Sequence, residues 1–194
     1  MQKDWPNFSK KLINKVGKII SSGKINYTTG IYGKEFEKKF SKFIGNKYSV
    51  ALCNVTAASE VAIKALKLPK KSEIIVPARS FFSSASCIVN TGHIPVFSDV
   101  DYITQNICLK DMQNKITKNT KAIICVHLGG VPCDMYGIKK IAKKNKLKII
   151  EDCSQAHGAS IDKKSVGSFG DISTWSFCND KIISTLGEGG MIST

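Results

Sequence analysis

Short apolar runs alternate with helical patterns along most of this chain, and no other feature restricts its fold as much. The runs lie at 49–53, 73–76, 95–98, 122–126, 148–150 and 172–176. Between several of them, apolar residues recur at helical spacing, at 56–66, 83–89 and 135–144. Strands and helices that alternate in this way form a mostly parallel sheet with helices on both faces. The sequence therefore predicts an α/β fold.

The N-terminal part of the chain has a different pattern. Residues 8–20 have a rough helical period, and a glycine-dotted loop follows at 23–33. A second helix is predicted at 35–44, where Phe36, Phe40 and Phe43 would form a packing face before Gly45 ends it. We therefore divide the chain into an N-terminal helix and loop at 1–33 and a larger domain at 34–194.

The net charge of +14 is a reason to consider nucleic-acid binding, because basic patches attract phosphate backbones. The residue types argue against that function. Arg79 is the only arginine, whereas base recognition and bidentate phosphate binding favour the planar guanidinium group. The lysines are spread along the predicted helices. We expect a solvated, lysine-rich surface and no nucleic-acid partner.

The seven cysteines contain no C-x-x-C pair, so zinc and iron–sulfur sites lack their usual spacing. Their number is odd and most have apolar neighbours, which is typical of buried thiols in a reducing compartment. No apolar run approaches the roughly 18 residues of a membrane span. The first residues also lack the apolar stretch of a signal peptide. These features predict a cytoplasmic protein without a metal or a membrane segment.

Polar groups follow the predicted strands at the points where the strands end. In chain order they are Asn54, Ser80, His127, Asp152 and Ser176, and Lys181 comes shortly after the last. Because sheets of this kind bind ligands beyond the carboxyl ends of their strands, we expect a site at this edge, with Thr56, Phe81, Asp152, Ser176 and Lys181 converging there.

The segment around Lys181 is the most specific motif in the chain. Ser176-Phe177 precedes the lysine, and the turn Gly187-Glu188-Gly189-Gly190 follows it. This pattern resembles the cofactor-lysine motif of the DegT/DnrJ family of sugar aminotransferases. The resemblance implies the large domain of an aspartate aminotransferase-like fold that binds pyridoxal 5'-phosphate (PLP), with Lys181 as the residue that forms the Schiff base.

A second segment that resembles the family is Glu151-Asp152-Cys153-Ser154-Gln155. In the family, an Asp-x-x-Gln element ends a strand, which implies that Asp152 pairs with the pyridinium nitrogen and that Gln155 lies beside the ring. A carboxylate there stabilises the protonated ring through a charge-assisted hydrogen bond. The alternative is that Asp152 only caps the next turn. His157 is interpreted as a packed, hydrogen-bonded histidine, and His127 is given no catalytic step.

The resemblance also implies the remaining cofactor contacts. Thr56 and Ala57 stand where the family opens a helix with Gly-Thr-Ala and binds the phosphate, although Val55 replaces the glycine. Thr56 could instead be an ordinary helix cap. Ser176 and Asn179 would add donors to the phosphate. Phe81 would stack on the ring, whereas its neighbour Phe82 is expected in the core.

The function implied by the resemblance is transfer of an amino group, usually from glutamate, to a nucleotide-linked keto-sugar, in amino-sugar and surface-polysaccharide biosynthesis by a homodimer. Lys181 would move the proton from the α-carbon of the donor. Two alternatives stay open: a PLP-binding regulatory protein without turnover, and a sugar dehydratase on the same scaffold. Lys181 argues against the dehydratase, because those enzymes carry histidine at this position.

Members of the family are longer than this chain, which stops inside a predicted strand after Gly189. We therefore expect a C-terminal small domain and part of the dimer surface to be missing from the chain as written. On that interpretation the 194-residue chain alone would be inactive.

Overall fold

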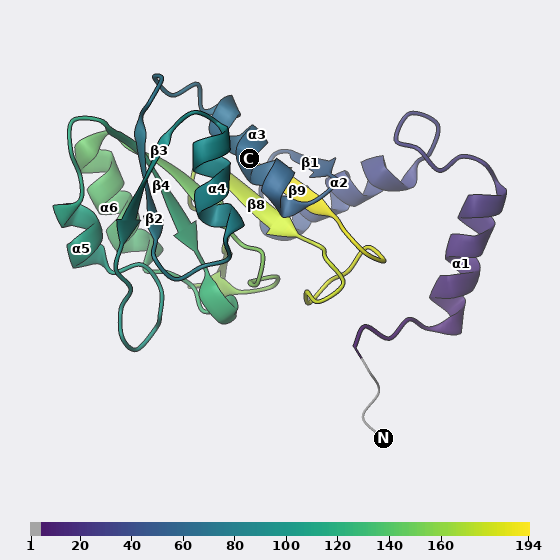
Figure 1. Ribbon diagram of the computed structural model, residues 1–194. Coiled ribbons are helices and arrows are strands. Elements are labelled where there is room, and N and C mark those ends of the chain that lie inside the picture. Colours follow the sequence, from purple (N-terminus) through teal and green to yellow (C-terminus); the bar gives the residue numbers. More distant parts are fainter. Residues whose placement is uncertain (1–4) are drawn as a thin grey trace.

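The computed structural model describes residues 5–194, and a seven-stranded sheet lies at its centre (Figure 1). The strand order is β1-β9-β8-β5-β4-β2-β3. All strands run in one direction except β9, which pairs antiparallel with both β1 and β8. The strands are β1 (Ser49–Leu52), β2 (Glu73–Pro77), β3 (Ile94–Ser98), β4 (Thr120–Val126), β5 (Lys148–Asp152), β8 (Ile172–Ser176) and β9 (Gly190–Ser193).

Helices cover both faces of the sheet, so the predicted fold class is confirmed. The helices α3 (Val55–Ala65) and α4 (Ser83–Asn90) pack on one face. The opposite face is covered by α2 (Tyr32–Ile44), α5 (Leu109–Asn114) and α6 (Met135–Asn145). The smaller elements are the 3₁₀ turn η1 (Leu128–Gly130) and the two-stranded ribbon of β6 (Ser160–Ile161) and β7 (Lys164–Ser165).

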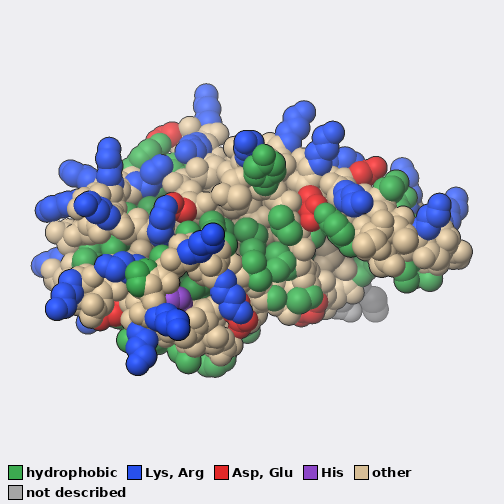
Figure 2. Space-filling model, turned by 90° about the horizontal axis from the view of Figure 1, so that it is seen from above, with side chains coloured by type: hydrophobic (Ala, Val, Ile, Leu, Met, Phe, Trp, Pro, Cys, Tyr) green, Lys and Arg blue, Asp and Glu red, His purple; other side chains and the backbone are tan. Residues whose placement is uncertain are grey.

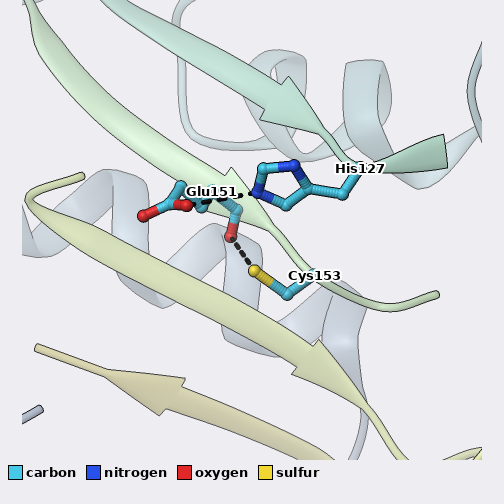
Figure 3. A group of neighbouring side chains, drawn as sticks. All are labelled: His127, Glu151 and Cys153. Carbon is cyan, nitrogen blue, oxygen red and sulfur yellow. Dashed lines mark hydrogen bonds and ion pairs between the residues drawn. The ribbon is translucent and has the colours of Figure 1, made fainter. Parts of the chain in front are cut away.

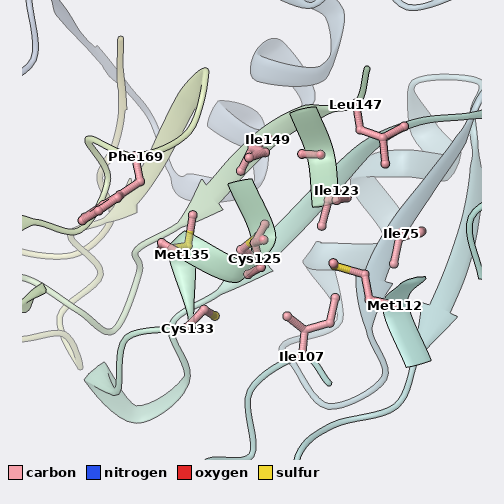
Figure 4. Packing of buried hydrophobic residues seen from close by; sticks show 12 residues of the cluster. Ile75, Ile107, Met112, Ile123, Cys125, Cys133, Met135, Leu147, Ile149 and Phe169 are labelled. Atoms are coloured by element: carbon pink, nitrogen blue, oxygen red, sulfur yellow. The ribbon is translucent and has the colours of Figure 1, made fainter. Parts of the chain in front are cut away.

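The central strands are apolar on both faces, which explains why they are continuous apolar runs in the sequence. Neighbouring residues of a strand point to opposite faces. Ile75, Ile123 and Ile149 pack towards α5 and α6, in the cluster shown in Figure 4. The adjacent Ile74, Ile124 and Ile150 pack beneath α3 and α4. The sheet is therefore packed between two apolar layers, and this packing fixes the positions of the strand ends.

The first helix stands apart from this body (Figure 1). Helix α1 (Lys10–Ser21) begins at Ser9, whose hydroxyl accepts a hydrogen bond from the Leu12 N–H at 3.3 Å. None of its twelve residues is buried. Residues 1–4 of the predicted N-terminal unit lie outside the described residues.

Helix α2 joins the body through two of its three phenylalanines. Phe40 is buried against Trp175, and Phe36 contacts Phe177 edge-on, with ring centroids 5.0 Å apart. Phe43, also expected on this packing face, is 55% exposed. Gly45 ends the helix in the left-handed conformation at φ 85°, as predicted.

Across residues 5–194, none of the helices combines the length and the apolar character that a membrane crossing requires.

Candidate functional site

A cleft of about 600 Å³ opens at the carboxyl ends of the parallel strands, which is the edge of the sheet predicted from the sequence. Six of the predicted site residues line it together. Thr56 comes from α3, Phe81 from the loop after β2, and Asp152 and Gln155 from the end of β5 and beyond. Ser176 and Lys181 come from β8 and its following loop. The strand order brings these distant segments together.

The two carboxylate oxygens of Asp152 differ: one is fixed by two hydrogen bonds, and the other accepts one weak hydrogen bond. Its Oδ1 accepts hydrogen bonds from the Ser154 hydroxyl at 2.5 Å and from the Ser154 N–H at 3.0 Å. Its Oδ2 accepts only a long contact of 3.5 Å from the Ser84 hydroxyl. The side chain does form a local turn with Ser154, but Oδ2 retains the capacity to accept a strong donor in the cleft. The protonated nitrogen of a pyridine ring is a donor of this kind.

Lys181 projects from a loop that closes on itself. The Phe177 N–H bonds the Gly189 carbonyl at 2.8 Å, and the Asn179 N–H bonds the Gly187 carbonyl at 2.9 Å. The Lys181 Nζ lies 2.7 Å from Asp180 Oδ2. This hydrogen bond from Lys181 is the main cause of the lowered pKa of Asp180. The lysine side chain is only 21% exposed, so the loop holds its amine in the cleft.

The turn that follows the lysine packs against the start of α3. Asn54 caps this helix, because its Oδ1 accepts the Ala57 N–H at 2.9 Å. A side chain at Gly190 would collide with the Asn54 carbonyl and would lie 2.9 Å from the Val55 nitrogen. Only glycine therefore lets β9 pass so close to the helix. The amides of Val55 and Thr56 border the cleft and have no acceptor within the helix, so this helix N-terminus is a candidate anion site.

Two further polar residues of the cleft have donors available. Ser176 Oγ accepts a 3.4 Å bond from the Cys178 N–H, which leaves its own proton free to be donated. Gln155 Oε1 accepts the Gly129 N–H at 2.6 Å and thereby ties η1 to the cleft, while its NH₂ group stays available. Ser176 and Gln155 therefore each offer a hydrogen-bond donor in the cleft.

Phe81 lies at the mouth of the cleft and is 71% exposed, so an apolar surface faces an incoming ligand. Phe82, which the sequence placed in the core, is 79% exposed. That expectation was wrong because Phe82 stands just before α4, where the inward positions are taken by Ser83 and Ser84.

Two predicted residues do not line the cleft. The Ala57 N–H is committed to the Asn54 cap, and Asn179 is exposed, with its side-chain oxygen 3.7 Å from the Cys178 thiol. Their phosphate roles stay predictions. Asn54 and Ser80, which the sequence placed only as polar groups at strand ends, do line the cleft, and the sequence reasoning gave no site role to the further lining residues Ser83, Ser154, Cys178, Asp180 and Glu188. The position of Ser154 inside the Asp152–Gln155 motif could have indicated one of them.

The charge inside the cleft is opposite to that of the surface. Asp152, Asp180 and Glu188 line it, and among residues 5–194 Lys181 is the single cationic residue of the lining. A hydrogen bond to Glu188 at 3.2 Å raises the pKa of the Cys178 thiol. The other lysines lie outside: in Figure 2 they are scattered across the face in view and do not gather into one patch. A phosphate in the cleft must therefore be held largely by neutral N–H and O–H donors.

A buried cluster on the other face of β5 contains His127, Glu151 and Cys153, whose potential ligand atoms lie within 4.8 Å of one another (Figure 3). The Cys133 N–H donates to His127 Nδ1 at 3.0 Å, so Nε2 carries the proton and donates to Glu151 at 3.1 Å. Both ring nitrogens are therefore occupied.

The Glu151 carboxylate also accepts N–H groups from the segment before β8, at 2.8, 2.7 and 2.6 Å from Gly167, Phe169 and Gly170. Burial raises the pKa of Glu151, but the hydrogen bonds from His127 and from the backbone amides outweigh it, and the net shift is downwards. Because its lone pairs are filled, the cluster is better suited to anchoring β4, β5 and this segment than to binding a metal.

His157 is packed, as predicted, but the hydrogen bond expected with it is not found among the described residues. Its ring lies 5.4 Å from Trp175 and 5.3 Å from Phe177, centroid to centroid. Among the described residues, neither ring nitrogen has a hydrogen-bond partner. Burial, assisted by repulsion from Lys181, lowers its pKa from 6.5 to about 4.

The chain matches the model of the DegT/DnrJ/EryC1/StrS aminotransferase family over residues 6–194. It is 44% identical over 165 residues to a GDP-perosamine synthase of Escherichia coli O157:H7, covering 85% of this chain and 45% of that protein. An aminotransferase from Psychrobacter cryohalolentis superimposes with a TM-score of 0.97 at 46% identity, covering 99% of this chain and 49% of that one.

The E. coli GDP-4-keto-6-deoxy-D-mannose-3-dehydratase, solved with hydrated PLP, has a TM-score of 0.91 at 30% identity and covers 98% of this chain and 51% of its own. The chain spans about half the length of the curated relatives it matches. With a family match over nearly all of its residues, and with the motifs around Asp152 and Lys181 placed in one cleft, the chain belongs to the DegT/DnrJ/EryC1/StrS aminotransferase family.

Proposed function

We propose that the protein carrying this chain is a PLP-dependent aminotransferase that moves an amino group from an amino acid to a nucleotide-linked keto-sugar. The observation that carries the proposal is the meeting of Lys181 and Asp152 in one cleft, beside the open N-terminus of α3. An amine, a carboxylate and an anion site are the three groups that PLP requires of a protein.

The cleft residues fit this cofactor in their chemistry. Val55, Thr56 and Ser176 would hold the phosphate through neutral donors, which suits a cleft that is otherwise rich in carboxylates. Asp152 Oδ2 would accept the ring N–H, and Phe81 would cover one face of the ring. Residues 34–194 would then be the cofactor-binding domain, and residues 1–33 an N-terminal helix and loop.

Bound PLP supplies an electron-accepting ring that stabilises negative charge at the α-carbon of an amino acid. The chain supplies the proton transfers and the orientation. Lys181 Nζ would hold the cofactor and would move a proton to and from the α-carbon of the donor. Asp152 would keep the ring nitrogen protonated, and the hydrogen bonds that fix Oδ1 would stop the carboxylate from rotating away.

The substrates and partners follow from the relatives. The GDP-perosamine synthases and the dTDP-3-amino-3,6-dideoxy-alpha-D-galactopyranose transaminase carry nucleotide-linked amino sugars in their names, which supports a keto-sugar nucleotide as the acceptor. We take glutamate as the donor and a homodimer as the assembly. The seven free thiols support a cytoplasmic location.

The deciding experiment supplies purified protein with PLP, glutamate and a panel of keto-sugar nucleotides, and follows the amino-sugar product and 2-oxoglutarate by mass spectrometry. We expect both products from the unmodified protein and neither from Lys181→Ala. Lys140→Ala, on the exposed surface of α6, is the matched control. PLP binding without either product would favour the regulatory alternative, and a deoxygenated sugar without nitrogen would favour the dehydratase.

A further inference from the structure

Ser84 connects the mouth of the cleft with Asp152. It lies in the first turn of α4 and is only 4% exposed. Its hydroxyl is 2.7 Å from the Ser80 hydroxyl and 3.5 Å from Asp152 Oδ2. Ser80 lines the cleft in the loop after β2. The hydroxyls of Ser80 and Ser84 thus form a chain of two hydrogen bonds that ends at the Asp152 carboxylate.

The direction of these hydrogen bonds follows from the chemistry of the groups. An ionised carboxylate accepts hydrogen bonds and has no proton to donate. Ser84 must therefore donate its single hydroxyl proton to Asp152. Its short contact with Ser80 is then satisfied only if Ser80 donates to Ser84. Both hydroxyl protons then point towards Asp152, and the lone pairs of the Ser80 oxygen face the cleft.

We propose that Ser80 and Ser84 form a one-way hydroxyl relay, and that Ser84 is a positioning residue which orients Asp152 Oδ2 as the acceptor for the cofactor ring. The inference rests on the proposed function, since it assigns a task to Asp152. The 3.5 Å contact is long, so Ser84 orients Oδ2 without saturating it. A carboxylate that loses this donor holds its negative charge less well, and a proton shared with the ring nitrogen shifts towards Asp152.

A second buried hydroxyl next to Asp152 provides a matched control. Thr174 is the register partner of Asp152 in the neighbouring strand and has no exposed surface. Its hydroxyl has no hydrogen-bond partner among the described residues. Thr174→Val therefore removes a neighbouring hydroxyl of the same burial that is not part of the relay.

The test uses PLP labelled with ¹⁵N in its ring, bound to the protein and to its variants. The ¹⁵N chemical shift reports ring protonation without any turnover, and a titration gives the dissociation constant. We expect Ser84→Ala to move the shift towards the unprotonated value and to weaken PLP binding about threefold to tenfold, the effect of one lost hydrogen bond. Ser84→Thr keeps the hydroxyl and should restore both values, and Thr174→Val should match the unmodified protein.

Asp152→Asn separates this inference from the proposed function. A changed ¹⁵N shift in Asp152→Asn together with an unchanged shift in Ser84→Ala would overturn the relay and leave the function standing. An unchanged shift in Asp152→Asn would overturn both. Should Ser84→Ala not fold, Ser80→Ala decides, because it removes the donor behind Ser84: about twofold weaker PLP binding is expected, and an unchanged shift and affinity would overturn the relay.

Discussion

Glu151 and Asp152 are consecutive carboxylates at the end of β5 that point to opposite faces of the sheet. Asp152 lines the cleft, whereas Glu151 is fully buried and binds His127 and three backbone amides. Adjacent residues of one strand are thereby assigned different tasks, because side chains alternate across a sheet. Substitution of Glu151 should therefore change the free energy of unfolding, whereas substitution of Asp152 should change the cofactor chemistry.

We expect Glu151→Gln to lower the free energy of unfolding by about 3 kcal/mol, since it leaves buried donors without their anionic acceptor. Urea unfolding would measure the loss. Glu35→Gln is the matched control, because Glu35 only pairs with Lys39 at 3.8 Å on an exposed helix surface. That change should stay within about 0.5 kcal/mol. Equal effects of both substitutions would contradict the anchoring role of Glu151.

Asp152→Asn should leave the free energy of unfolding nearly unchanged and should keep some bound PLP. It should nevertheless remove most transamination, because a neutral amide does not stabilise a protonated ring. Cofactor content measured by absorbance, beside the rate of amino-sugar formation, separates the two effects. Full activity in Asp152→Asn would mean that another group protonates the ring.

Lys181→Ala should abolish the yellow absorbance of lysine-bound cofactor and reduce transamination by orders of magnitude, since no other cation lines the cleft. Borohydride reduction followed by peptide mapping would identify the modified lysine in the unmodified protein. If the absorbance band survives in Lys181→Ala, a different lysine holds the cofactor.

Gly190→Ala should weaken PLP binding far more than Gly187→Ala. A methyl group at Gly190 collides with the Asn54 carbonyl, whereas none of the surrounding atoms lies within 4 Å of a methyl group at Gly187. The collision displaces the first turn of α3, and with it the phosphate site. Equilibrium titration of both variants with PLP is the measurement. Equal affinities would show that the close approach of β9 does not shape the site.

Acid should destabilise the fold through His157. Its pKa is about 4 in the folded protein against an ordinary 6.5, so between these values the unfolded state binds more protons. The stabilising contribution is complete above pH 6.5 and is lost as the pH falls towards 4. The gap corresponds to about 3 kcal/mol. His157→Gln should flatten this part of a plot of unfolding free energy against pH, and an unchanged slope would exclude His157 as its source.

The sequence predicted the strands and strand ends that form the site better than it predicted the contacts of individual side chains. Six apolar runs became strands, and the residues at their ends, including Asp152 and Ser176, met in one cleft because parallel strands share an edge. The motif around Lys181 predicted a residue that does line the cleft, but it did not predict the ion pair of Lys181 with Asp180. That contact depends on the conformation of the loop. A loop conformation leaves no periodic pattern or fixed residue spacing from which a single sequence could predict it.

Two predicted details depended on local geometry that pattern alone does not specify. Ala57 is predicted to donate its N–H to a phosphate, and this role stays a prediction, although the Asn54 side chain accepts that N–H in the structure. Phe82 was expected in the core because it is large and apolar, yet it stands where α4 begins and points outwards. In both cases the outcome follows from the exact residue at which a helix begins, which is the least predictable part of a helix.

The position of β9 between β1 and β8 has a consequence for folding. Ser49 pairs with Ser193, so β1 has no partner within the sheet until a strand more than a hundred residues later in the chain arrives. Contacts between such distant residues form slowly, since a long loop must close first. The anion site at α3, which lies against Gly190, should therefore be among the last parts to mature. Pulse-labelled hydrogen exchange would then show late protection at β1 and early protection at β4 and β5, and the growing chain would acquire its affinity for PLP only after its core has formed.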